Sequence, residues 1–341
     1  MKLITIAVPC YNSQDYLHTC LDSLVKSGTE VEVIVVNDGS TDNTQTIAKE
    51  YEKKYPNIVR VVSKMNGGHG SAVNEGLKHA TGLFYKVVDS DDWLDELAFN
   101  QLLDTIRKHY EEKTLADLYI CNFIYDKVLE NRSYVRSFKK HFKTERFLSW
   151  KEVKTFYGSQ VLLMHSLIYN TDLLRQSNTH LPSHTFYVDN IFAYKPLPYM
   201  HKIYYLNIDL YHYFIGREDQ SVNIKVFTQR YDQQIRVMKE MVMAYSYNEI
   251  TRFEKGLKKY MFHCLGAIMV ITILFTVAKD DNERRENLQE LWCFIKNRDV
   301  KLYRLLRLRS LPAIVNYLPW RLRGAIMIMV YKHLRRRLKL G

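Results

Sequence analysis

The sequence predicts an α/β fold with a mostly parallel sheet, because short strands alternate with helices over residues 3–88. Apolar, β-branched runs that end in turn-forming residues predict strands at residues 3–8, 31–36, 59–62 and 84–88. Apolar residues at helical spacing fill the intervals between these runs, at residues 16–25, 42–55 and 72–80. Such alternation places helices on the faces of a parallel sheet.

The ends of these elements carry signals of their own. The first strand is expected to stop at Pro9, and the second at the turn formed by residues 37–40. Hydroxyl side chains that can cap a helix precede two of the helices: Ser40 and Thr41 before residues 42–55, and Ser71 before residues 72–80.

Most of the unusual loops follow the predicted strands, at residues 9–12, 37–40, 67–70 and 89–92. In α/β sheets, ligands bind in the crevice at the carboxyl ends of the strands. We therefore expect one crevice to collect all four loops.

Three carboxylates crowd the last of these loops. Asp89, Asp91 and Asp92 lie within four positions, directly after an apolar run. Ionised carboxylates this close repel one another, so a metal ion or a positively charged substrate is expected to neutralise them. Oxygen ligands select a hard ion such as Mg²⁺ or Mn²⁺. The alternative is an acidic turn that caps the next helix.

Four motifs resemble the nucleotide-binding half of family 2 glycosyltransferases, which are inverting enzymes of the GT-A fold. They read Ile6-Ala7-Val8-Pro9-Cys10-Tyr11-Asn12, Val36-Asn37-Asp38-Gly39-Ser40-Thr41-Asp42, Asn66-Gly67-Gly68 and Asp89-Ser90-Asp91-Asp92. The resemblance is to enzymes of bacterial polysaccharide or teichoic-acid synthesis. It implies a nucleotide-sugar donor, here a UDP-sugar, together with Mn²⁺ or Mg²⁺.

The resemblance also implies roles for individual residues. The tyrosine and aspartate that hold uracil in the family correspond to Tyr11 and Asp38, and a ring face and a carboxylate suit that base. The acidic segment would hold the ribose and the metal ion, with Asp91 as the main ligand beside Asp89 and Asp92. The donor-binding residues expected in all are Pro9, Tyr11, Asn12, Asp38, Lys64, Gly67, Gly68, Asn74, Asp89, Ser90 and Arg217.

The chain departs from the family at the phosphate contact. Many relatives have an arginine before the asparagine that corresponds to Asn74, whereas this chain has Val73. Lys64 or His69 would supply the missing charge, or both are solvated loop residues. The glycines at 67, 68 and 70 leave backbone N–H groups open to an anion near a helix N-terminus.

The resemblance places the general base in an acidic dipeptide downstream. Asp189 is that base here, with Val188 where a glutamate often stands. Apolar neighbours would partly desolvate Asp189 and raise its pKa. The alternative is a helix N-cap at Asp189. Asp172 is a competing carboxylate, although its sequence favours a cap.

Two further segments belong to the acceptor side by position. His165 would contact the acceptor or the base, or is a core histidine with satisfied hydrogen bonds. Residues 215–222 resemble a loop that closes over the donor pyrophosphate, with Arg217 as the phosphate contact. An exposed ion pair with Glu218 is the alternative for Arg217.

Length and composition predict two regions in the 341 residues: an α/β domain over residues 1–225, and a helical region over residues 226–341. The resemblance implies that the first of these is a GT-A domain. The five cysteines are scattered and show neither disulfide nor zinc spacing. The first strand begins almost at Met1, so no signal peptide is expected and the chain is predicted to be cytoplasmic.

The carboxyl-terminal tail, residues 300–341, carries most of the positive charge. It holds eleven Lys and Arg and no Asp or Glu, against a net charge of +12 for the chain. Leucines and other apolar residues are interleaved with the charges, which predicts binding to an anionic membrane at its inner face. Nucleic acid is disfavoured, because it does not need these apolar residues. A solvated helical face and a contact between copies of the chain are the alternatives.

Residues 260–278 contain no Asp, Glu, Lys or Arg over nineteen positions. That length approaches the roughly 20 residues of a spanning helix. A buried or interfacial helix is favoured over a spanning helix, because the flanking lysines give no orientation signal.

Three function classes compete. The first is a glycosyltransferase that moves a sugar to a glycan or lipid-linked acceptor in cell-surface polysaccharide synthesis. The second is a sugar-phosphate nucleotidyltransferase, which would normally have a glycine-rich basic loop after the first strand, where this chain has residues 9–12. The third is a non-catalytic membrane adaptor, disfavoured by the presence of Asp38, Asp91 and Asp189. The first class is favoured.

Overall fold

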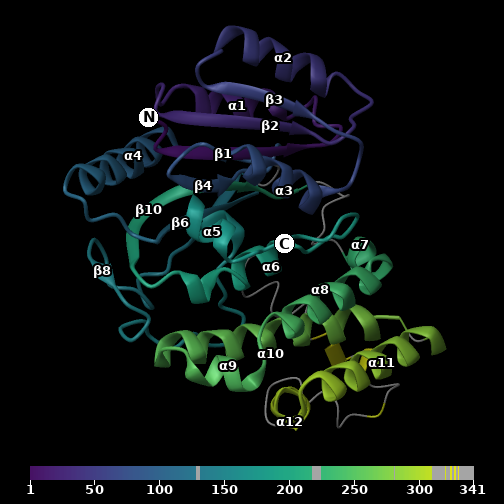
Figure 1. Ribbon diagram of the computed structural model, residues 1–341. Coiled ribbons are helices and arrows are strands. Elements are labelled where there is room, and N and C mark those ends of the chain that lie inside the picture. The colour runs from purple at the N-terminus through teal and green to yellow at the C-terminus, as the bar shows by residue number, and fades with distance from the viewer. Residues whose placement is uncertain are drawn as a thin grey trace. The chain divides into compact units, whose positions relative to one another are not determined.

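The computed structural model describes residues 1–127, 131–216, 224–279 and 281–308, together with residues 319, 323–324, 326–327 and 329. The chain divides into two compact units (Figure 1). The first unit comprises Met1–Lys154 and Leu162–Gly216, and the second comprises Thr155–Val161 and Arg217–Gly341. The predicted domain division after residue 225 stays a prediction.

The described part of the first unit is built on one ten-stranded sheet, with strand order β3-β2-β1-β4-β9-β6-β10-β5, and with β7 and β8 paired to β6 and β10. The strands are β1 Ile4–Cys10, β2 Val31–Asn37, β3 Val59–Ser63, β4 Phe84–Val87, β5 Trp93–Leu94, β6 Leu118–Lys127, β7 Arg132–Arg136, β8 Phe147–Leu148, β9 Leu167–Asn170 and β10 Ile203–Phe214. Its helices are α1 Leu17–Val25, α2 Thr44–Lys54, α3 His69–His79, α4 Glu96–Glu111, α5 Thr171–Gln176 and α6 Asp189–Tyr194, with short 3₁₀ turns η2 Met164–Ser166 and η3 Leu197–Tyr199.

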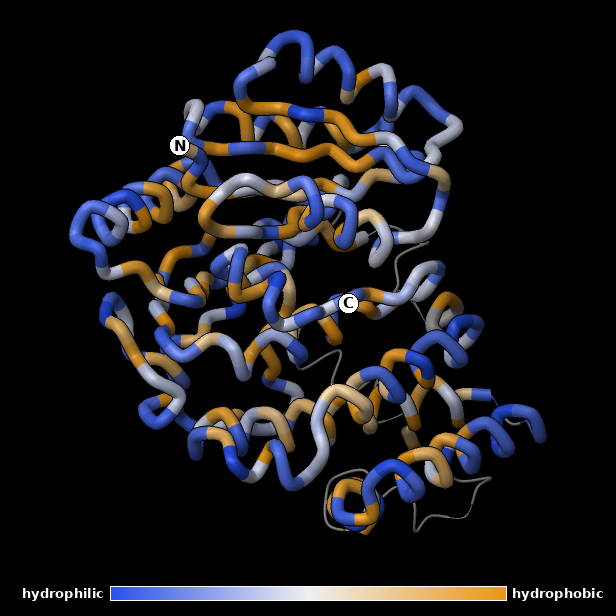
Figure 2. The backbone as a smooth tube through the Cα atoms, viewed as in Figure 1, coloured by the Kyte–Doolittle hydropathy of each residue, from blue (hydrophilic) through white to orange (hydrophobic). Residues whose placement is uncertain are grey.

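The predicted α/β class and central parallel sheet are confirmed. Strands β3, β2, β1 and β4 are all parallel, and β6 is parallel to β10. The antiparallel strand β9 joins these two parallel groups, because it pairs with both β4 and β6. Strands β1 and β2 are buried along their whole length, and Figure 2 shows them predominantly in the apolar colour. Alternation of strand and helix did not predict β9.

The prediction that Pro9 stops the first strand is wrong. Strand β1 continues to Cys10, and Pro9 lies opposite Val36 of β2. Ala7 accepts a hydrogen bond from Val88 on the β4 side, where the pairing then ends. The nitrogen of Pro9 faces the β4 side beyond the end of this pairing. No strand carbonyl there needs a hydrogen bond from residue 9, so proline is tolerated.

Two predicted helix caps are also wrong. Helix α2 begins at Thr44, whose N–H donates to the side chain of Asp42 at 3.0 Å, rather than after Ser40 and Thr41. Helix α3 begins at His69, two residues before the predicted cap Ser71. Gly68, with a positive φ of 81°, makes the turn into α3. The glycine loop therefore joins the helix directly.

The described part of the second unit is mainly helical, and its segment Thr155–Val161 is not. Its helices are α7 Ile224–Gln229, α8 Tyr231–Ala244, α9 Tyr247–Arg252, α10 Lys255–Val277, α11 Asn282–Arg298 and α12 Val300–Leu308. Arg284 ties them together, because its buried guanidinium donates to the carbonyls of Phe275 and Thr228 and lies 4.1 Å from the ring centroid of Tyr231. Most of the basic tail lies outside the described residues.

Helix α10 is long and apolar enough to cross a membrane by length and composition alone. Two thirds of its most apolar 18-residue window is nevertheless buried inside the protein. Gln234 of α8 donates to Thr272, and the ring of Phe156 lies 4.7 Å from that of Tyr260. These contacts are typical of a core helix. Length and composition alone do not distinguish a core helix from a spanning helix.

The packing of α3 on β1 yields a stability prediction. A Cβ at Gly76 would lie 2.6 Å from the Cβ of Ala7, an atom fixed to the strand backbone. We expect Gly76→Ala to lower the free energy of unfolding by ~1–2 kcal/mol, because overpacking outweighs the helix propensity gained. Urea denaturation measures the change.

Gly266→Ala is the matched control. Gly266 is also within a helix, but a Cβ there meets no atom within 4 Å. That substitution should keep or raise stability by up to about 1 kcal/mol. Equal effects of the two alanines on stability would show that α3 does not depend on this close approach.

Candidate functional site

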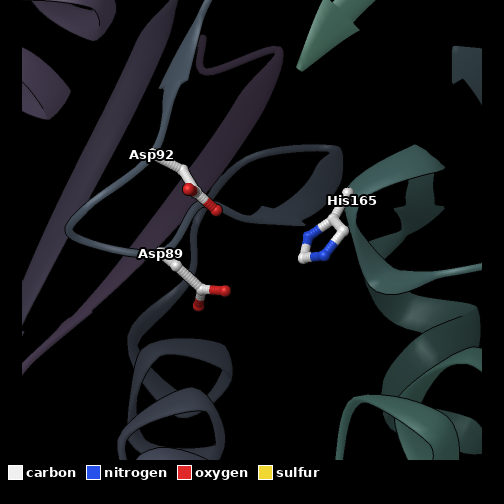
Figure 3. Close-up of side chains that lie close together, drawn as sticks. All are labelled: Asp89, Asp92 and His165. Carbon is white, nitrogen blue, oxygen red and sulfur yellow. The ribbon is translucent and has the colours of Figure 1, made fainter. Parts of the chain in front are cut away.

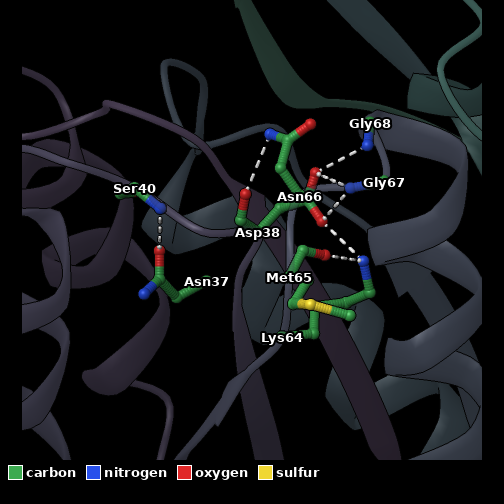
Figure 4. Close-up of polar contacts among 8 residues, drawn as sticks. All are labelled: Asn37, Asp38, Ser40, Lys64, Met65, Asn66, Gly67 and Gly68. Atoms are coloured by element: carbon green, nitrogen blue, oxygen red, sulfur yellow. Dashed lines mark hydrogen bonds and ion pairs between the residues drawn. The ribbon is translucent and has the colours of Figure 1, made fainter.

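The buried carboxylate of Asp38 organises the loops after β2 and β3 (Figure 4). It accepts hydrogen bonds from the N–H groups of Gly67 at 2.9 Å and Gly68 at 2.7 Å, and from the ammonium of Lys64 at 2.7 Å. Its own carbonyl accepts from the side chain of Asn66 at 2.9 Å. Asp38 thereby fixes the glycine loop to the end of β2.

This arrangement changes the roles expected for the glycine loop. The N–H groups of Gly67 and Gly68 were expected to be open to an anionic ligand, but they are bonded to a protein carboxylate. Lys64 is not a solvated loop residue, since it pairs with Asp38, and its phosphate contact stays a prediction. A Cβ at Gly67 would lie 2.5 Å from the hydroxyl of Ser71 and 2.9 Å from Lys64. Glycine is required here so that the loop can close on Asp38.

Two asparagines expected to bind the donor hold loops together, and their donor contacts stay predictions. The side-chain oxygen of Asn12 accepts from the N–H of Thr41 at 2.9 Å. Both ends of the Asn74 amide bond to the backbone of Leu181, at 2.8 and 3.0 Å. The ring of Tyr11, by contrast, is 54% exposed and open to a ligand.

A second group of side chains lies at the end of β4 (Figure 3). The ligand atoms of Asp89, Asp92 and His165 all lie within 4.8 Å of one another. His165 comes from the turn η2, far along the chain, and the sequence placed it on the acceptor side. The structure brings it to the acidic cluster.

Neighbouring groups fix these three side chains. The Tyr211 hydroxyl and the Phe214 N–H, the latter at 2.8 Å, both donate to the carboxylate of Asp92. The ammonium of Lys86, fully buried in β4, donates to the carbonyl of His165 at 2.6 Å. Burial lowers the pKa of Lys86 to about 8. Sequence reasoning missed Lys86 and Tyr211, although a lysine within an apolar strand is an unusual signal.

The donor atoms of this group fit a divalent cation. Among the described residues, the Nδ1 atom of buried His165 has no hydrogen-bond partner. Burial lowers the pKa of His165 to about 4, so its imidazole is neutral and can act as a ligand at pH 7. Asp91, the expected main ligand, is not part of the group formed by Asp89, Asp92 and His165. Its assignment as a metal ligand stays a prediction.

His69 extends the group toward the glycine loop. Its Nε2 atom lies 2.8 Å from the carboxylate of Asp89. Burial alone would raise the pKa of Asp89 and lower that of His69, but their charges and shared hydrogen bond outweigh burial in both. The pKa of Asp92 is instead raised by burial and by the charges of Asp91 and Asp89. The raised pKa of His69 favours its protonated form next to Asp89, and the hydrogen bond shows that His69 is not a solvated loop residue.

Asp189 is the expected base, and it lies at the start of α6. Val188 precedes this helix and no side-chain cap is present, so Asp189 is not the N-cap. Burial raises the pKa of Asp189 to about 6; His69 opposes the shift and Asp89 adds to it. Since these charges act on one another, Asp189 lies within electrostatic range of the acidic cluster.

The remaining predicted residues have various outcomes. Asp172 is not a cap, because Asn170 caps α5, and its side chain is 83% exposed. Ser90 is buried, with its hydroxyl 2.7 Å from that of Ser13. Arg217 lies outside the described residues.

Comparisons with known proteins find a family, similar sequences and similar folds. The family described as Glycosyl transferase family 2 matches residues 5–170. EpsH of Bacillus subtilis, named as a glycosyltransferase, is 28% identical over 247 residues, which are 68% of this chain and 64% of EpsH. The poly(ribitol-phosphate) beta-glucosyltransferase of Bacillus spizizenii is 30% identical over 185 residues, 53% of this chain and 27% of that enzyme.

A solved structure extends the likeness over nearly the whole chain. The crystal structure of S. aureus TarS 1-349 in complex with UDP-GlcNAc has a TM-score of 0.66 and 22% identity, and the alignment covers 99% of this chain and 92% of that one. This likeness shows the fold. This chain spans about two thirds or less of the two curated relatives above. The match identifies residues 5–170 of the chain as a member of glycosyl transferase family 2.

Proposed function

We propose that the protein transfers a sugar, with inversion, from a UDP-sugar to a glycan or lipid-linked acceptor in cell-surface polysaccharide synthesis. The observation that carries this proposal is the gathering of Asp89, Asp92 and His165 within electrostatic range of a carboxylate with a raised pKa, Asp189. A metal-binding group and a base are the two parts that such a transfer needs. Teichoic-acid and polysaccharide enzymes among the relatives support the acceptor class.

The donor class rests on the loops after β1 and β2. Tyr11 offers an exposed ring face that suits a uracil base. Asp38 is the proposed second contact, and its carboxylate would accept from the base in addition to Lys64, Gly67 and Gly68. The UDP-GlcNAc bound to TarS supports the same class. Incubation with UDP-GlcNAc, UDP-glucose, UDP-galactose and GDP-mannose, with nucleotide release as the readout, tests it. We expect release from at least one UDP-sugar, and release from GDP-mannose alone would contradict the uridine assignment.

The metal would be held by Asp89, Asp92 and His165, and either Mn²⁺ or Mg²⁺ suits these ligands. When bound, such an ion neutralises charge on the leaving pyrophosphate. The protein supports this role by keeping His165 neutral and by orienting Asp92 through Tyr211. His69, whose raised pKa favours the protonated form, lies beside Asp89 and would replace the charge of the arginine that many relatives have at the position of Val73.

Asp189 would remove the proton of the attacking acceptor hydroxyl. Burial raises its pKa to about 6, so it is ionised at pH 7 while being a stronger base than an ordinary aspartate. As the pH falls through 6, Asp189 gains a proton and can no longer act as a base.

The base assignment predicts a loss of turnover. Asp189→Asn should lower kcat by ~10²- to 10⁴-fold with little change in UDP affinity. In the unmodified protein, kcat/KM should fall about tenfold per pH unit below about 6. Asp172→Asn, the same change at an exposed carboxylate, is the control and should leave kcat intact. Near-normal turnover of Asp189→Asn would assign the base to another residue.

The metal assignment predicts a loss of Mn²⁺-dependent UDP affinity. His165→Ala should weaken that affinity by ~10-fold or more in calorimetry, because one metal ligand is removed. His79→Ala is the control, since His79 pairs with Glu75 on α3. Unchanged affinity in His165→Ala would limit His165 to a packing role.

The sequence predicts Asp91 as the main metal ligand, whereas in the structure Asp92 lies with the other two ligands. Calorimetry of Asp91→Asn and Asp92→Asn distinguishes these two assignments. We expect Asp92→Asn to show the larger loss of Mn²⁺ dependence, because Asp92 lies with Asp89 and His165. A loss confined to Asp91→Asn would restore Asp91 as the main ligand.

We also propose that the basic tail binds the inner, anionic face of the plasma membrane. The charge of residues 300–341 supports this, with each basic residue worth up to about 1 kcal/mol near such a surface. Replacing Arg335, Arg336 and Arg337 by Gln should weaken flotation with phosphatidylserine vesicles, and salt should weaken it further. The same triple change at Lys49, Lys53 and Lys54 of α2 is the control. Equal flotation of both variants would exclude the tail as the anchor.

A further inference from the structure

Four aromatic side chains share one face of the sheet at the ends of β6 and β10. The register of these parallel strands places Phe123 beside Tyr211 and Tyr125 beside Tyr213. Since side chains alternate along a strand, all four rings lie on the same face. The His165 ring packs on this face, with its centroid 4.7 Å from those of both Tyr211 and Tyr213. The aromatic face therefore adjoins the metal-binding group.

The inner and outer pairs of rings differ in exposure and in hydrogen bonding. Phe123 and Tyr211 are fully buried, and Tyr211 is committed to Asp92. Tyr125 and Tyr213 are partly exposed, with ring centroids 5.8 Å apart at an interplanar angle of 48°. Their two hydroxyls make no hydrogen bond with any residue in the described part of the chain. The outer pair thus offers ring surface and free hydroxyls to a ligand.

The position of the outer pair distinguishes it from the donor-binding loops. The uracil contacts expected at Tyr11 and Asp38 follow β1 and β2, whereas Tyr125 and Tyr213 are on β6 and β10. In the strand order, β4 with Asp89 at its end lies between these two pairs of strands. A donor whose pyrophosphate is held at β4 would therefore have its uracil on one side and the two tyrosines on the other.

The proposed general base, Asp189, lies on the same side as the two tyrosines. Burial raises the pKa of Tyr125 to about 12, the charge of Arg136 opposes the shift, and the charge of Asp189 adds to it. The charges of Asp92 and Asp89 act similarly on Tyr213. The outer pair is thus within electrostatic range of both the base and the metal-binding group.

We propose that Tyr125 and Tyr213 form the subsite for the acceptor sugar. This inference rests on the proposed function, and it assigns the carbohydrate unit whose hydroxyl meets Asp189. A sugar ring has an apolar face of C–H groups that packs on aromatic rings, and hydroxyls that exchange hydrogen bonds with tyrosine. A tyrosine side chain loses little conformational entropy on binding, so two such rings form a rigid binding surface.

Saturation-transfer NMR with methyl glycosides tests the subsite directly. The probes are methyl β-glucopyranoside, methyl β-galactopyranoside and methyl N-acetyl-β-glucosaminide, each added to the full chain with UDP and Mn²⁺. We expect transfer to at least one glycoside, and Tyr125→Leu should weaken its affinity by ~5- to 10-fold. Tyr125→Phe should retain more affinity than Tyr125→Leu, because it keeps the ring. Tyr110→Leu, at an exposed tyrosine on α4, is the matched control.

Calorimetry with UDP and Mn²⁺ separates this inference from the proposed function. Tyr125 does not pack against His165, so Tyr125→Leu should keep its UDP affinity while losing glycoside affinity. If the unmodified protein binds no UDP, the proposed function fails. If it binds UDP, the subsite is overturned by any of three results: no glycoside signal, equal glycoside affinity in Tyr125→Leu and Tyr110→Leu, or a loss confined to UDP affinity.

Discussion

The burial of Asp92 is the constraint on which the rest of the site depends. A carboxylate removed from water next to Asp89 and Asp91 is unfavourable unless its oxygens are satisfied. The hydroxyl of Tyr211 and the N–H of Phe214 satisfy them, and both come from β10. This contact joins the end of β4 to the second parallel group of the sheet. The same tyrosine packs against His165, so the placement of one buried acid also positions the third side chain of the cluster.

A second buried carboxylate performs a similar task at the other end of the crevice. Asp38 draws the glycine loop and Lys64 onto the end of β2, and its positive partner compensates its charge. The loop is therefore ordered by the protein itself, and a ligand that binds there has little conformational entropy left to remove. The two acids use opposite solutions, since Asp38 has a cation beside it whereas Asp92 has only neutral donors. That difference leaves Asp92 without a positive partner, which is a condition that favours a divalent ion.

The sequence predicted the parallel group of strands and the loops at their ends, because apolar runs and glycine-rich turns are local signals. It could not predict which loop groups bind one another. Asn12, Asn74 and Lys64 carry side chains suited to a ligand, and only the folded chain shows that backbone groups and Asp38 already occupy them. His165 was identified as a functional candidate but given to the acceptor, since its approach to Asp89 depends on the antiparallel strand β9, which alternation of strand and helix does not reveal. The early start of α3 was missed for a related reason, because Gly68 turns the chain in a conformation that no capping motif announces.

The contact between Asp92 and β10 also has a consequence for the synthesis of the chain. The two partners of Asp92 follow it by 119 and 122 residues, so a ribosome adding 5–20 residues per second needs roughly 6 to 24 seconds to supply them. During that interval the strands up to β4 can pair, but Asp92 lacks both of its donors and stays hydrated. A fragment that ends at residue 170, where the family match ends, would remain in this state permanently. Residues 5–170 thus do not contain the two donors that satisfy Asp92, and that end of the sheet can close only once β10 has been made.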